Sequence, residues 1–224
     1  MCLEHPLLLL LGAMYQYEAT SIAGFVQQLA VAYIGHGYRF YVTGRIPDRK
    51  VPKNVDAKLL SRYDIEISKW ARSRRKRAEL ANVHYLRYGR FFILIATKGE
   101  HKFFHDEPNL RDVRRSPIKC FGYSISSKRG NDRKWHPCVR IHPDEYRKLK
   151  AYLLDLAVRR SGEQLCRAFR KLPFEPFAPI RSQYLNILRA VNRERAAAGL
   201  SQIEKSCVRL HRSPVRVFET SWDI

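Results

Sequence analysis

The chain has 224 residues, of which 42 are Lys or Arg and 21 are Asp or Glu, so its formal net charge at pH 7 is +21. A hydrophobic fraction of 45% is that of a folded domain and excludes a largely disordered chain. The positive field attracts polyanions. Nucleic acid is favoured over acidic lipid, because the sequence shows neither a basic amphipathic helix nor an acylation signal.

The cysteines and the start of the chain bear on location. Five cysteines occur at wide spacings without a C-x-x-C pair, so we expect neither a zinc finger nor a disulfide framework. We expect the protein to reside in a reducing, cytoplasmic compartment. The apolar run at residues 7–11 lacks the preceding cation and the cleavage site of a signal peptide. We expect residues 1–20 to be a poorly specified leader and expect no membrane partner.

The next segment predicts a helix and then a strand. Ser21 precedes apolar residues that recur at helical spacing over residues 22–34, and Gly37 follows as a stop signal. Residues 38–46 have the aromatic and β-branched composition of a strand. We expect this helix to pack on the body of the protein.

A second helical region leaves two alternatives open. We expect Asn54 to cap a helix that reaches Tyr63. Either this helix continues to residue 78, or residues 64–67 form a turn and Ser68 caps a separate basic helix. The second alternative resembles a helix-turn-helix in its spacing.

Two hairpins follow. Residues 82–97 switch to strand periodicity around Gly89, and their second half is apolar on both faces, which predicts a central strand. Residues 117–128 and 135–141 predict a second hairpin with a cationic tip. The last third predicts helices that begin at Pro143, Ser161 and Ile180.

These elements predict an α+β fold: an antiparallel sheet of two hairpins plus an N-terminal strand, helices on one face, and a helical C-terminal part. We expect residues 21–172 to form the nucleic-acid-binding core. Residues 173–224 would be a proline-rich loop, a helix and basic C-terminal strands packed on that core.

Residues 69–90 carry eight Lys or Arg and one carboxylate, Glu79. Like charges on one helix repel unless phosphate or distant carboxylates offset them. We therefore expect phosphate contacts, and we expect Trp70 to anchor the helix. The predicted contacts in this helix are Lys69, Arg72, Arg74, Arg75, Lys76 and Arg77. Further contacts are predicted from Arg87, Arg90, Arg114, Arg115, Lys128 and Arg129.

The predicted partner is nucleic acid, with RNA slightly preferred, because basic strand tips beside tyrosines suit single-stranded shapes better than groove reading. The strand aromatics, such as Tyr85 and Phe92, are favoured as core residues over base-stacking residues. A helix-turn-helix DNA regulator is an alternative function.

A metal-dependent nuclease or a mobile-element enzyme of the transposase or replication type is the other alternative. The loop at residues 100–112 gathers imidazoles and carboxylates that suit Mg²⁺ or Mn²⁺. Its weak catalytic candidates are His101, His105, Asp106, Glu107 and Asp112. The sequence has no histidine-hydrophobic-histidine pair, which the mobile-element enzymes would need, so we assign no metal ligand and no other cofactor. Whether the chain is an enzyme stays open.

Overall fold

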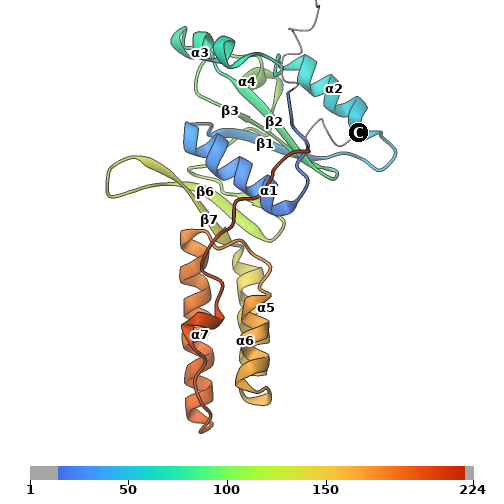
Figure 1. Cartoon of the computed structure of the whole chain (residues 1–224). Helices are drawn as coiled ribbons and strands as arrows, with labels where there is room; N and C mark the ends of the chain where they lie inside the picture. The colour runs from blue at the N-terminus through green and yellow to red at the C-terminus, as the bar shows by residue number, and fades with distance from the viewer. Residues whose placement is uncertain (1–14, 220–224) are drawn as a thin grey trace, which may run out of the picture.

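The structure is a computed structural model that describes residues 15–219 (Figure 1). Two antiparallel sheets and seven α-helices within this range confirm the α+β class. The strands are β1 (Phe40–Arg45), β2 (Val83–Tyr88), β3 (Phe91–Ala96), β4 (Arg111–Asp112), β5 (Ile118–Cys120), β6 (Tyr123–Arg129) and β7 (Trp135–Ile141). The helices are α1 (Ile22–Gln27), α2 (Pro52–Arg62), α3 (Lys69–Arg77), α4 (Phe103–Asp106), α5 (Pro143–Arg159), α6 (Gly162–Arg170) and α7 (Ala178–Ala197).

The two predicted hairpins both form, but they lie in separate sheets and not in one. The first sheet has the strand order β2-β3-β1-β4, and the second has the order β5-β6-β7. Strand β3 is central, as expected from its apolar residues on both faces. Both faces of this strand are buried. Ile93 and Ile95 lie in one buried cluster with Ile125 of the second sheet, and Leu94 lies in the other buried cluster.

Helices cover both faces of the first sheet, which corrects the expectation of one helical face. On one side, Phe25 of α1 belongs to the same cluster as the second sheet. On the other side, Leu60 of α2 and the following Tyr63 pack with Leu94 and Tyr85. The first sheet is therefore the middle layer, and the alternating pleat of β2 and β3 supplies both cores.

The N-terminal helix begins where predicted, because the Ser21 hydroxyl accepts a hydrogen bond from the Gly24 amide at 3.0 Å. Helix α1 continues as a π turn (Gln28–Tyr33) and a 3₁₀ turn (Ile34–His36). Of the predicted leader, residues 1–14 lie outside the described residues. Residues 15–20 lie along β2, where the Ala19 amide donates to the Arg87 carbonyl at 2.8 Å.

Helices α2 and α3 are separate, as in the second alternative. Helix α2 begins at Pro52 and not after Asn54, because the fixed φ of proline suits the first helical position. Asp64 adopts a left-handed φ of 48°, which interrupts the helix. The Ser68 hydroxyl then caps α3 by accepting from the Ala71 amide at 3.1 Å.

The C-terminal helices α5, α6 and α7 project together away from the two sheets (Figure 1). Helix α5 begins at Pro143, as predicted. The expected basic strands do not form: residues 208–219 are an extended segment outside both sheets that runs from the start of α7 to α1 (Figure 1). The Val217 carbonyl accepts from the Thr20 amide at 2.9 Å, so this segment is held by isolated bonds rather than by a ladder.

Cys166 of α6 and Cys207 form a disulfide across a sequence separation of 41 residues. The sequence had predicted no disulfide framework, because the wide spacing of the cysteines along the chain does not reveal that Cys166 and Cys207 lie close together. Disulfides are typical of oxidising compartments, so the expected cytoplasmic location stays a prediction. Across residues 15–219, no helix has both the length and the apolar character of a membrane span.

His84 of β2 lies among tyrosines, stacked on Tyr33 with ring centroids 4.4 Å apart, and the Tyr15 hydroxyl lies 2.9 Å from His84 Nδ1. Burial, with a contribution from the Arg72 cation, lowers the pKa of His84 from 6.5 to about 3. The imidazole is therefore neutral in the folded protein at neutral pH. An unfolded chain would protonate it below about pH 6.5.

This difference predicts acid sensitivity. Between pH 6.5 and about 3 the unfolded state binds the proton that the folded state excludes, so the free energy of unfolding falls as the pH falls, by up to ~1.4 kcal/mol per pH unit from this group. We expect His84→Phe to flatten that slope in urea unfolding measured across this range. An unchanged slope in the variant would mean that other groups cause the acid sensitivity.

Candidate nucleic-acid interface

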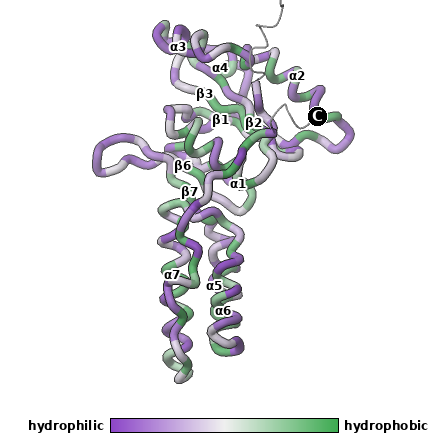
Figure 2. Tube along the Cα trace, viewed as in Figure 1, coloured by the Kyte–Doolittle hydropathy of each residue, from purple (hydrophilic) through white to green (hydrophobic). Residues whose placement is uncertain are grey.

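Helix α3 lies at the periphery of the molecule and has no buried residue. Trp70 is 76% exposed, so the expectation that it anchors the helix is wrong. The trace of α3 is coloured mainly hydrophilic (Figure 2). A large exposed ring among cations has no packing role, which makes it the first residue to consider for ligand contact.

Polar contacts fasten α3 to the body in place of apolar packing. The Arg72 guanidinium donates to the carbonyl oxygen of Val83 at 3.0 Å and to that of Ile65. The Asn82 side chain donates to the Arg72 carbonyl at 3.0 Å. Arg72 therefore attaches α3 to the body of the protein. Because its guanidinium is engaged in these contacts, it is not available for the predicted contact with phosphate.

The remaining cations of α3 are mostly exposed. Within residues 15–219, the side chains of four of them make no hydrogen bond and no ion pair: Lys69, Arg74, Lys76 and Arg77. The neighbouring Glu79 is exposed, and its carboxylate also makes no hydrogen bond and no ion pair within these residues. Four uncompensated charges on one short helix repel one another, and an anionic partner would relieve that repulsion.

Arg75 differs from these four residues. It is half-buried, and its Nε atom is buried without a hydrogen-bond partner in the described part of the chain. It lines a hollow of about 460 Å³ with Lys102, His101 and His105, together with the carboxylates Asp64 and Glu100. Burial lowers the pKa of His101, and the nearby Arg75 cation lowers it further. The mixed charges make this hollow a poor anion site.

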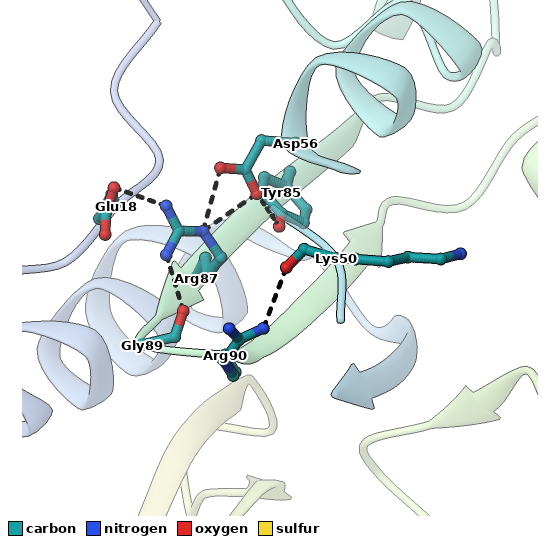
Figure 3. Close-up of polar contacts among 7 residues, drawn as sticks. All are labelled: Glu18, Lys50, Asp56, Tyr85, Arg87, Gly89 and Arg90. Atoms are coloured by element: carbon teal, nitrogen blue, oxygen red, sulfur yellow. Dashed lines mark hydrogen bonds and ion pairs between the residues drawn. The ribbon is translucent and has the colours of Figure 1, made fainter. Parts of the chain in front are cut away.

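Arg87 is only 3% exposed, so the prediction that it contacts phosphate is wrong. Its guanidinium binds both carboxylate oxygens of Asp56, Glu18 and the Gly89 carbonyl (Figure 3). The Tyr85 hydroxyl donates to the same Asp56 at 2.5 Å. This buried network holds α2 and residues 15–20 against β2.

Arg90 is also engaged within the protein. Its guanidinium donates to the carbonyls of Pro47 and Lys50, at 2.8 and 3.1 Å (Figure 3 draws the Lys50 contact), and it pairs with the Asp48 carboxylate at 3.2 Å. These contacts close the loop between β1 and α2. The side chain is 31% exposed, so its main contribution is to this loop.

The other predicted contacts lie near the second hairpin. Arg114 binds the Asp112 carboxylate and stacks over Trp135, with 5.4 Å from its guanidinium carbon to the ring centroid. Arg115 is exposed on the same loop. Lys128 and Arg129 are exposed at the end of β6, and the β6–β7 hairpin projects from the body with a hydrophilic tip (Figures 1 and 2).

The five catalytic candidates do not come together as a metal site. Asp106 pairs with Arg62 at 3.0 Å, Glu107 accepts from the Tyr63 hydroxyl at 2.5 Å, and Asp112 holds Arg114. His101 is buried and accepts from the Phe103 amide, at 3.0 Å. In the described part of the chain no group of three or more such side chains could hold a metal ion.

The strand aromatics belong to the cores, as favoured from the sequence. Tyr85 is fully buried, and Phe92 packs against the same cluster. Neither the exposure of Trp70 nor the role of Trp135 as a platform for Arg39 and Arg114 was predicted from the sequence. One signal was present in the sequence: Trp70 lies on a helix that is mostly cationic and has no apolar stripe.

Neither a protein-family model, nor a curated protein, nor a solved structure matches this chain. Its function is therefore inferred from its own residues.

Proposed function

We propose that this protein binds nucleic acid through the backbone phosphates, with α3 as its main contact surface and single-stranded RNA as its preferred partner. The exposed Trp70 between uncompensated cations is the observation that carries the proposal. Proteins that bind single strands combine cations along the backbone with aromatic rings on which bases stack. Helix α3 presents both on one element.

The electrostatic part of the contact comes from Lys69, Arg74, Lys76 and Arg77. Their side chains have no partner within residues 15–219, so phosphate contacts would not require an internal ion pair to break. The attachment of α3 through Arg72 and Asn82 leaves these groups facing solvent. Binding by such contacts is independent of sequence and weakens with salt.

The preference for RNA rests on the tryptophan. A base must be unstacked to lie on an exposed ring, and unpaired bases occur in the loops and ends of RNA. Duplex DNA offers its phosphates but not its base faces. We therefore expect single-stranded RNA to bind more tightly than duplex DNA of equal length.

The helix-turn-helix alternative finds less support in the packing. A recognition helix packs one face against the protein while its other face enters the major groove. Helix α3 has no buried residue, and the residues between α2 and α3 include the buried Tyr63 and Ile65, which belong to the core beside β2 and β3. Equal binding to random and specific duplexes would remove this alternative.

Substitution of Trp70 tests the stacking contact. We expect Trp70→Ala to weaken binding of single-stranded RNA by ~1–3 kcal/mol, the usual contribution of one stacked base. The salt dependence should stay unchanged, because no cation is removed. Fluorescence anisotropy with a labelled oligonucleotide measures both quantities.

The matched control is Tyr152→Ala on α5, because Tyr152 is also an exposed aromatic residue, at 58%, but lies on the projecting C-terminal helices (Figure 1). We expect this variant to bind like the wild type. If the two variants lose affinity equally, or if Trp70→Ala loses none, α3 does not stack a base.

A further inference from the structure

A second basic hollow, of about 330 Å³, lies where the first sheet meets the second. Its cations are Arg111 of β4, Arg115 of the following loop and Lys119 of β5. The other side chains that line it are Tyr41 and Thr43 of β1, Ser116 and Pro117. The volume falls at the lower end of the range for small-molecule sites, about 300–1,000 Å³.

The edge of β1 forms one side of this hollow. Strand β4 pairs with β1 only at Phe40 and Tyr41, so from Val42 onward no strand among residues 15–219 lies on this side of β1. Thr43 is exposed there, and its hydroxyl makes no hydrogen bond within the described residues. The Ser116 hydroxyl also makes no hydrogen bond within the described residues. Two hydroxyl donors are therefore available beside the three cations.

The loop that carries Arg115 is held in place before any ligand binds. The Asp112 carbonyl accepts from the amides of Arg115 and Ser116, at 3.0 and 2.8 Å. The Tyr41 hydroxyl donates to the Ser116 carbonyl at 2.9 Å, which ties the loop to β1. A fixed loop reduces the ordering cost of binding.

The charges of the hollow are of one sign. None of the seven described residues that line it has a carboxylate. The nearby Asp112 carboxylate is bound by the Arg114 guanidinium and by the Arg114 amide, although it also lies close enough to Arg115 to interact with its charge. The hollow beside Arg75 differs, since two carboxylates line it.

We propose that this hollow binds the phosphate group of a phosphorylated ligand, either a free nucleotide or the terminal phosphate of a strand. Arginine side chains match the geometry of phosphate oxygens, and the Lys119 ammonium and the two hydroxyls supply further donors. The inference does not depend on nucleic-acid binding by α3, because the hollow shares no residue with that helix.

Isothermal titration with inorganic phosphate, AMP and adenosine at about 0.15 M salt tests the site. We expect saturable binding of phosphate and AMP and none of adenosine. Arg115→Gln should weaken binding of both anions about tenfold or more, as expected for loss of a charge-assisted hydrogen bond. Thr43→Asp should abolish binding, because it places a carboxylate in the hollow. Both residues are exposed, so neither change removes a buried contact.

The control is Lys171→Gln, which removes one exposed cation directly after α6, outside the hollow. It should bind phosphate like the wild type. Absence of saturable binding, or equal weakening in Lys171→Gln and Arg115→Gln, would overturn the proposal. Short RNA with and without a 5′-phosphate then separates the two sources: tighter binding of the phosphorylated strand, with the gain lost in Arg115→Gln, assigns the site to strand ends, and equal binding of the two strands assigns it to free nucleotides.

Discussion

Asp56→Ala should lower the free energy of unfolding by about 3–5 kcal/mol, because it leaves the Arg87 guanidinium buried without its main counter-charge. Both side chains of this pair are almost wholly inaccessible, with 0% and 4% exposure. The same substitution removes the acceptor of the Tyr85 hydroxyl. Urea unfolding of the two proteins measures the difference.

Glu18→Ala is the matched control for this prediction. Glu18 also binds the Arg87 guanidinium, but its side chain is 53% exposed, so water can replace the lost contact. We expect a destabilisation of at most about 1 kcal/mol. Equal effects of the two substitutions would show that burial of the Asp56–Arg87 pair does not govern its contribution.

Removal of three charges from α3 has the second large expected effect. We expect Arg74→Gln, Lys76→Gln and Arg77→Gln together to lower the slope of log affinity against log salt by about 2, since each phosphate contact on a single strand contributes about 0.7. At about 0.1 M salt this corresponds to roughly a hundredfold loss of affinity. Glutamine keeps the helix propensity of the segment.

The control for net charge is a triple change on the projecting helices: Arg170→Gln, Lys171→Gln and Arg193→Gln. These cations are exposed and have no ion pair within residues 15–219, so the net charge changes equally. If the control loses as much affinity as the α3 variant, binding depends on overall charge and α3 has no special role.

Elements governed by local signals were predictable from the sequence. Ser21 and Ser68 cap helices as expected, and Pro143 opens one, because each signal acts on a neighbouring amide or on its own backbone. The prediction that Asn54 caps the next helix was wrong for a reason that is also local, because Pro52 starts that helix two residues earlier. The distribution of the two hairpins between sheets depends on long-range packing, which no local pattern records.

The same limit explains the errors at the candidate site. A charge count treats Arg87 and Arg74 alike, yet strand parity places Arg87 on the face of Tyr85, toward Asp56. The strand parity can be predicted from the sequence, whereas the pairing of Arg87 with Asp56 on α2 cannot. Trp70 was predicted to anchor α3, but this helix buries none of its residues and leaves the Trp70 ring exposed.

The most direct test of α3 as a nucleic-acid interface is the affinity of the unmodified protein for labelled single-stranded RNA at about 50 and about 200 mM salt, in the presence of Mg²⁺. Four uncompensated cations predict saturable binding that weakens at least about 50-fold between the two conditions. The RNA should stay intact, and cleavage would point to the nuclease alternative. Absence of saturable binding at the lower salt, or equal affinity at both, would contradict the proposal.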